Sequence, residues 1–173
     1  MNIDLFKSVS IRGRVAYGIC CFENVLLSLD YHSEDWKIVL RHLWRFMSEP
    51  LLDDCFSVMV ELIPDNLTET PVYDEDFEQI TNEEYLALYQ LYQNIDEFIT
   101  VLLRDIYYIC AVHAYSSIVG YGKESLNSLQ DLICHMNERN FPLPDYVRFL
   151  EFSLEEDDKW GKDFDGTKLS KIL

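Results

Sequence analysis

Glycine and proline are scarce in this chain of 173 residues, with 6 and 5 copies. Folds built from many short strands need these residues at their turns, so their scarcity favours helices. No segment approaches the roughly 18 uncharged apolar residues of a membrane span, and no basic stretch leads into an apolar run at the N-terminus. We therefore expect a soluble, cytoplasmic, all-α protein with no export signal and no membrane partner.

The motifs of common enzymes and metal sites are also missing. The five cysteines form no C-x-x-C pair and are odd in number, so we expect buried free thiols rather than a disulfide framework. The four histidines show no metal-ligand spacing, and there is no Glu-x-x-His motif, phosphate-binding loop or G-x-S-x-G elbow. The sequence thus predicts no enzyme activity, no catalytic residue, no bound metal and no cofactor.

Positive charge is absent from a third of the chain. Between Phe46 and Leu103 there is no Lys, Arg or His, while 14 of the 31 acidic residues fall in this stretch. It therefore carries −14 of the total charge of −17. A net charge of magnitude about 2 to 8 already keeps a small domain soluble, so this concentration of like charge favours a functional role. Acidic segments that only maintain solubility are the alternative.

Apolar residues, in contrast, are plentiful. Hydrophobic residues make up 49% of the chain and aromatic residues 14%, which is enough to build a core despite the high net charge. The length is close to that of one ordinary domain. We expect a single all-α domain over residues 1–173, with loosely ordered ends near residues 1–8 and 164–173.

Hydrophobic residues recur at helical spacing and predict a compact bundle of six to seven helices. The expected helices cover residues 12–29, 33–48, 50–63, 82–119, 124–139 and 145–160. Thr81 and Glu84 have the spacing of a capping box, and a break at residues 94–96 would divide the long central helix in two. Residues 65–80 form one long acidic loop that has room for a short helical turn.

The acidic stretch is the candidate binding surface. A negative field repels nucleic acids and anionic membranes and attracts basic proteins. Tyrosines lie among the carboxylates, a mixture typical of protein interfaces. Tyr85 and Tyr92 continue the apolar stripe and are expected in the core, whereas Tyr89 is expected at the surface. The candidate partner-binding residues are Asp65, Glu69, Tyr73, Asp74, Glu75, Asp76, Glu78, Glu83, Glu84 and Tyr89.

Three segments carry a resemblance to a known class of proteins. Residues 14–23 (RVAYGICCFE), residues 36–44 (WKIVLRHLW) and the sequence Ile63-Pro64-Asp65 resemble the all-α immunity proteins of bacterial polymorphic toxin systems, and a related uncharacterised all-α bacterial family. The resemblance implies a protein that neutralises a cognate toxin by tight binding, and such toxins are often basic nucleases. It supplies no catalytic residue.

Two other functions are consistent with the same residues. A small helical enzyme could use paired carboxylates with a divalent metal, which would require carboxylates that converge in a pocket. A structural or regulatory helical adaptor would differ from an immunity protein only in its partner. Asp74, Glu75, Asp76 and Glu78 lack the glycine and the spacing of a calcium-binding EF-hand loop. Whether the carboxylates gather in space is left open by the sequence.

Overall fold

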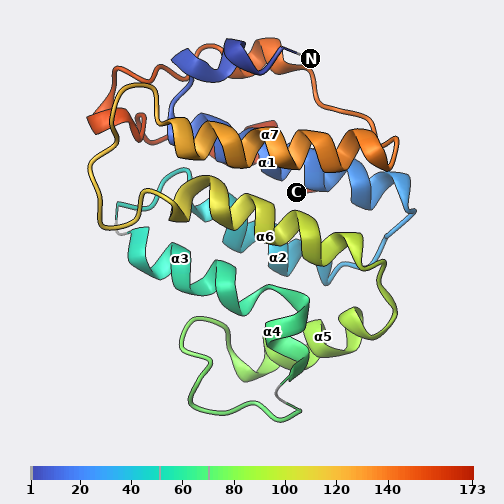
Figure 1. Ribbon diagram of the computed structural model, residues 1–173. Helices are drawn as coiled ribbons and strands as arrows, with labels where there is room; N and C mark the ends of the chain where they lie inside the picture. The colour runs from blue at the N-terminus through green and yellow to red at the C-terminus, as the bar shows by residue number, and fades with distance from the viewer. Residues whose placement is uncertain (1, 51, 70) are drawn as a thin grey trace.

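A computed structural model describes residues 2–50, 52–69 and 71–173. Three residues lie outside the described residues: Met1 of the end expected to be loosely ordered, Leu51 of the helix predicted for residues 50–63, and Thr70 of the loop predicted for residues 65–80. The described chain forms seven α-helices and no strand, so the predicted all-α bundle is confirmed (Figure 1). The α-helices are α1 (Ile11–Ser28), α2 (Trp36–Arg45), α3 (Leu52–Glu61), α4 (Pro64–Glu69), α5 (Asn82–Leu91), α6 (Phe98–Ala111) and α7 (Lys123–Glu138). Short 3-10 helices are η1 (Ile3–Ser8), η2 (Tyr92–Asn94), η3 (Tyr146–Phe149), η4 (Asp157–Lys159) and η5 (Gly166–Leu169).

Helix α1 is the central helix of the bundle. Every residue from Ile11 to Leu26 is buried, and α1 packs against α2, α6 and α7. Gly18 permits this close packing, because a Cβ atom there would lie 3.2–3.3 Å from side-chain carbons of Ile106, Ile109 and Leu132. Ser10 caps the helix by accepting a hydrogen bond from the Gly13 amide.

Charged residues on α1 hold distant segments against the bundle. Arg12 donates to the carbonyl oxygens of Phe46, Glu49 and Gly161, at 2.8–3.3 Å. Glu23 accepts hydrogen bonds from Trp44 Nε1 and from the backbone amide of Lys171. Because buried ionic groups are costly unless they are hydrogen-bonded, these contacts make the positions of the attached segments specific.

The two ends of the chain differ from the sequence prediction. In η1, Phe6 is fully buried and its ring lies 4.9 Å from that of Tyr17. Near the C-terminus, Lys171 Nζ donates to Asn24 Oδ1 and the Phe164 amide donates to the Met47 carbonyl. The described residues 2–8 and 164–173 are thus packed on the bundle, and the expectation of loosely ordered ends is wrong.

The helix predicted for residues 145–160 is also wrong. The segment forms only the short turns η3 and η4, and Asp157, Asp158 and Lys159 have positive φ angles. Its backbone instead bonds to the start of the chain: the Leu154 amide donates to the Ser8 carbonyl and the Ser10 amide to the Phe152 carbonyl. Long-range backbone pairing therefore replaces helical hydrogen bonds here.

The central helical region contains the predicted capping box and break. Thr81 and Glu84 form the reciprocal capping box at the start of α5. The helix ends near Tyr92, and α6 begins at Phe98, so residues 94–96 do separate two helices. Helix α6 then ends at Ala111, eight residues before the predicted end at residue 119. Tyr115 lies in the following loop with a left-handed φ of 62°.

The region between α3 and α5 contains more helix than predicted. Pro64 does not only end α3; it is the first residue of α4, where its missing amide hydrogen costs nothing. The predicted loop is therefore reduced to residues 71–80, which we call the acidic loop. Four cysteines are buried as expected, but Cys134 is exposed on α7. None of the helices in the described part of the chain is both long and apolar enough to span a bilayer.

Candidate functional site

Helices α4 and α5 and the acidic loop together form one end of the molecule, which we call the acidic end. Figure 1 shows the loop projecting beyond the helices at the bottom of the view. Helix α4 packs against α5, so the two ends of the loop are held by neighbouring helices. Eight of the ten predicted binding residues fall between Glu69 and Glu84, within or beside this loop. Of the other two, Asp65 lies on α4 and Tyr89 on α5.

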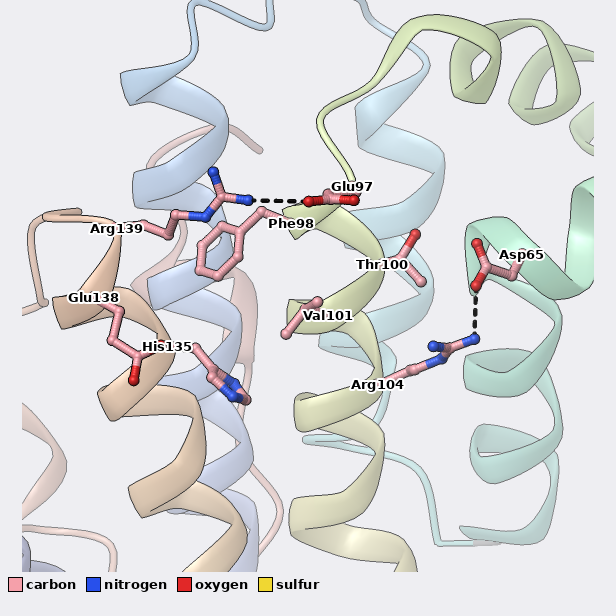
Figure 2. A pocket seen from close by; sticks show the side chains of 9 residues that line it. All are labelled: Asp65, Glu97, Phe98, Thr100, Val101, Arg104, His135, Glu138 and Arg139. Atoms are coloured by element: carbon pink, nitrogen blue, oxygen red, sulfur yellow. Dashed lines mark hydrogen bonds and ion pairs between the residues drawn. The ribbon is translucent and has the colours of Figure 1, made fainter.

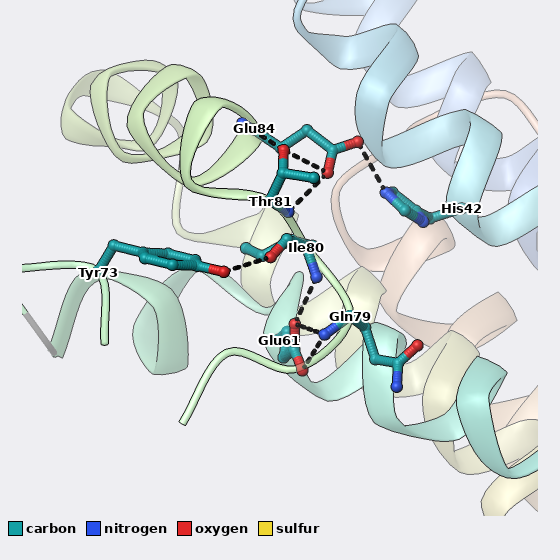
Figure 3. Close-up of polar contacts among 7 residues, drawn as sticks. All are labelled: His42, Glu61, Tyr73, Gln79, Ile80, Thr81 and Glu84. Carbon is teal, nitrogen blue, oxygen red and sulfur yellow. Dashed lines mark hydrogen bonds and ion pairs between the residues drawn. The ribbon is translucent and has the colours of Figure 1, made fainter. Parts of the chain in front are cut away.

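Glu61 fixes part of the backbone of the acidic loop. At the end of α3, its carboxylate accepts hydrogen bonds from the backbone amides of Glu78, Gln79 and Ile80, at 3.0–3.1 Å. Figure 3 shows those from Gln79 and Ile80. A carboxylate that accepts several amide hydrogens binds them strongly, because the charge strengthens each hydrogen bond. Glu61 is therefore a structural residue that holds this stretch of loop in one conformation.

Two aromatic side chains of the acidic loop, Tyr73 and Phe77, stabilise its conformation. The Tyr73 hydroxyl donates to the Ile80 carbonyl at 3.1 Å, so it bridges the two ends of the loop (Figure 3). The Tyr73 ring stacks on Phe77 with centroids 5.7 Å apart, and both rings contact Tyr85. Tyr73 is half-buried, so it supports the loop more than it contributes to the outer surface.

Glu84 is engaged within the protein. It accepts hydrogen bonds from the Thr81 amide and hydroxyl, and its other oxygen lies 3.1 Å from His42 Nε2 on α2 (Figure 3). Partial burial works to raise the pKa of the Glu84 carboxyl, but these hydrogen bonds outweigh burial and lower the pKa below its usual value. Glu84 positions α5 and is not a free binding group.

Asp65 and Tyr89 are also less available than predicted. Asp65 Oδ2 lies 2.7 Å from Arg104 Nη2, so its charge is paired within the molecule. Tyr89 is half-buried and packs on the Tyr85 ring at 5.7 Å. Tyr85 and Tyr92 are buried in the core, as expected.

Besides the paired Asp65, six of the predicted carboxylates are exposed at the acidic end. None of them has a cationic partner among the residues that the structure describes. They are Glu69, Asp74, Glu75, Asp76, Glu78 and Glu83. The contact recorded for their side chains is local: Asp74 Oδ1 accepts the Asp76 amide at 3.0 Å. The structure therefore presents unpaired negative charge on the acidic loop and on the adjoining ends of α4 and α5. Glu61 and Tyr73 hold the backbone of residues 77–80 of this loop.

The remaining carboxylates of the cation-free stretch lie elsewhere, and one of them, Glu49, lies 2.8 Å from Arg45. Asp53 and Asp54 are exposed in the first turn of α3. Asp96 and Glu97 precede α6 and lie 3.7 and 3.5 Å from Arg139 on α7. The stretch that is continuous in sequence is thus divided between three parts of the surface, and six of its carboxylates without a cationic partner among the described residues lie at the acidic end.

A separate groove of about 460 Å³ runs between α6 and α7 (Figure 2). Arg104 and Arg139 lie at its two sides, each turned toward a carboxylate, and His135 points into it from α7. His135 also contacts Asp105 of α6, with Nδ1 2.7 Å from Asp105 Oδ2. Burial raises the pKa of the Asp105 carboxyl, although His135 opposes the shift. Carboxylates and cations alternate here, so the groove has no dominant charge.

The sequence did not identify Glu61 or the pair of His135 and Asp105. Glu61 is one acidic residue among fourteen, and nothing local distinguishes it from an exposed one. His135 and Asp105 are 30 residues apart and meet only because α6 packs on α7. Across residues 2–50, 52–69 and 71–173, no three or more His, Cys, Asp or Glu side chains are grouped so that they could hold a metal ion. The convergence of carboxylates that a metal-dependent enzyme requires is therefore not found in this part of the chain.

Comparison of the chain with known proteins gives no significant match. No protein-family model matches the chain, and no curated protein or solved structure is significantly similar to it. The likeness to immunity proteins thus remains a likeness of sequence pattern, and function must be argued from the surface itself.

Proposed function

We propose that this chain is a non-catalytic binding protein that docks a basic protein partner on its acidic end. The observation that carries the proposal is the set of six exposed carboxylates without cationic partners at the acidic end. Like charges crowded on a loop repel one another and lower stability, so a loop of this kind is costly unless the field is used.

The loop's anchoring also supports docking. Glu61 and Tyr73 together bond to five backbone groups of residues 77–80. A preorganised loop loses little conformational entropy when it binds, which raises affinity without any added contact. Flexible acidic segments that serve only solubility have no need of such anchors.

The partner's class follows from charge. Arg and Lys side chains form charge-assisted hydrogen bonds with carboxylates, and opposite fields accelerate encounter. The sequence resemblance makes the proposal narrower: the partner is a cognate toxin domain, and the acidic end covers its basic, nuclease-like active site or the surface beside it. A cellular adaptor would use the same surface for a different basic protein.

The test uses the protein encoded beside this gene, produced with an affinity tag. We expect binding at or below about micromolar concentration and inhibition of that protein's toxicity. The association rate should fall as salt rises, because exposed charges are screened. Absence of both binding and inhibition at low micromolar concentration contradicts the toxin proposal.

Matched variants separate the acidic end from overall charge. The loop variant is D74N/E75Q/D76N/E78Q, and the control D131N/E151Q/E155Q/D158N removes the same charge from exposed positions elsewhere. The loop variant should lower the association rate about tenfold, and the control should change it about twofold or less. Equal losses in both variants would show that net charge, not the acidic end, attracts the partner.

A further inference from the structure

A second surface lies where the end of α6 meets the beginning of α3. In Figure 1 the first turn of α3 and the last turn of α6 lie on the same side of the bundle, away from the acidic loop. A hollow of about 190 Å³ opens between them, lined by α3, by Tyr107 of α6 and by the loop that follows α6. Phe56 lines the hollow and packs on Phe46 and Trp160 of the core.

An exposed tyrosine lines this hollow, and other exposed apolar side chains lie near it in the sequence. Tyr115 is 91% exposed, and Tyr108, Val112 and Val119 of the same region are also exposed. Most large apolar side chains of this protein are buried, so a group of exposed ones within twelve residues is unusual. Tyrosine is enriched at the centre of protein interfaces because it offers a large contact area with one polar group.

The conformation of Tyr115 is itself costly. Its φ of 62° lies in the left-handed region, which glycine occupies freely and which costs other residues about 1–2 kcal/mol. Glycine is the usual residue at such a position after a helix. A nearly fully exposed tyrosine in this conformation makes no packing contribution that offsets the strain, and strain of this kind concentrates at functional sites.

The negative charge around the hollow favours a cationic ligand. Asp53 lines it, is exposed and has no cationic partner among the residues that the structure describes. Helix α6 has no basic residue in its last turn, so the partial negative charge at its C-terminus is not neutralised locally. Tyr107 and Tyr115 also line the hollow, so this slot combines a carboxylate with two aromatic side chains, which is an environment that a guanidinium prefers.

We propose that this slot, formed by Asp53, Phe56, Tyr107 and Tyr115, receives an arginine side chain of a basic protein partner. The guanidinium stacks on the tyrosine rings and bonds to Asp53, while its methylene groups cover Phe56. The slot is a contact separate from the acidic end, and it rests on the proposed function only for the class of the partner.

The experiment is an NMR titration of the full chain with the peptide acetyl-Gly-Arg-Gly-amide. We expect saturable shifts of the Tyr107 and Tyr115 ring signals and of the Asp53 amide. The same peptide with citrulline, which keeps the shape and lacks the charge, should bind about tenfold more weakly. Equal shifts with the citrulline peptide would overturn the assignment of an arginine site.

Paired substitutions test the slot residue by residue. Y115G and D53N should each weaken peptide binding about fivefold or more. V119A and D54N change an exposed apolar side chain and an exposed aspartate that do not line the slot, and they should leave binding within about twofold. Because glycine suits the backbone at position 115, Y115G should keep or raise the thermal midpoint, so lost binding cannot be attributed to unfolding.

Other outcomes overturn the slot while leaving the acidic end intact. Shifts confined to residues 74–78 that persist in Y115G would place the arginine on the acidic loop. Concentration-dependent association without peptide, abolished by Y115G, would show that the slot contacts a second copy of this chain. Conversely, a partner that still binds the D74N/E75Q/D76N/E78Q variant at full rate but loses affinity for Y115G would contradict the proposed function and support the slot.

Discussion

Helix α1 carries Arg12, Arg14 and Glu23 at 0–2% exposure, each held by hydrogen bonds, whereas the acidic loop carries exposed carboxylates with no cationic partner in the described chain. The buried charges bind segments that lie far apart in sequence, and they therefore specify the fold. The exposed charges contribute nothing to that specificity and repel one another. The difference separates charge that maintains structure from charge that is available to a partner.

The largest expected effect concerns Arg14. Its guanidinium is fully buried and donates to the carbonyls of Phe6, Tyr121 and Gly122, at 2.6–3.2 Å. Burial lowers the pKa of Arg14 to about 10, and Tyr121 opposes this shift only in part. R14M would leave these carbonyls without their donor and should lower the free energy of unfolding by about 3 kcal/mol or more, measured by urea denaturation.

The control for Arg14 is another arginine in an exposed pair. Arg45 lies 2.8 Å from Glu49 at i,i+4 with its side chain 45% exposed, so R45M should cost about 0.5 kcal/mol or less. If both variants lost the same stability, the distinction between buried structural charge and exposed charge would not hold.

A smaller effect is expected at Glu61. It belongs to the acidic stretch, but it maintains structure as the buried charges of α1 do. E61Q keeps the size of the side chain but removes the charge that binds the amides of residues 78–80, so the free energy of unfolding should fall by about 1–2 kcal/mol. Hydrogen exchange of those three amides should accelerate. E69Q, an exposed neighbour of the loop, should change neither quantity; faster exchange in E69Q would mean that the loop is not held by Glu61 in particular.

Sequence patterns predicted those elements whose signals are local. The stripe of α1, the capping box of Thr81 and Glu84 and the break before α6 each depend on residues within a few positions of one another. Residues 145–160 have a helical pattern too, but their backbone pairs with residues 8–12, which no local signal reveals. Tertiary hydrogen bonds outweighed helical propensity there.

The candidate site shows the same limit. Composition predicted a binding surface rich in carboxylates, but it could not show which of them are paired within the protein. Asp65 is neutralised by Arg104, 39 residues away, and Glu84 is bound by His42, 42 residues away. Only the three-dimensional arrangement shows which carboxylates are engaged within the protein and which face solvent unpaired.

The smallest expected effect concerns His113, a titratable side chain buried in the core. It is 4% exposed, and its Nε2 atom has no hydrogen-bond partner among the described residues. Burial lowers the pKa of His113, Glu124 opposes this, and Arg14 lowers it further. Since the unfolded chain then binds the proton more tightly, the contribution of His113 to stability is complete above its unfolded pKa of about 6.5 and is lost as the pH drops below that value.

We expect the urea midpoint of the native chain to fall between about pH 7.5 and 5.5 by more than that of H113Q, in which this position does not titrate. Parallel losses in the two proteins would show that His113 is charged as readily in the fold as in the unfolded chain, and that the core tolerates an unpaired cation beside Arg14.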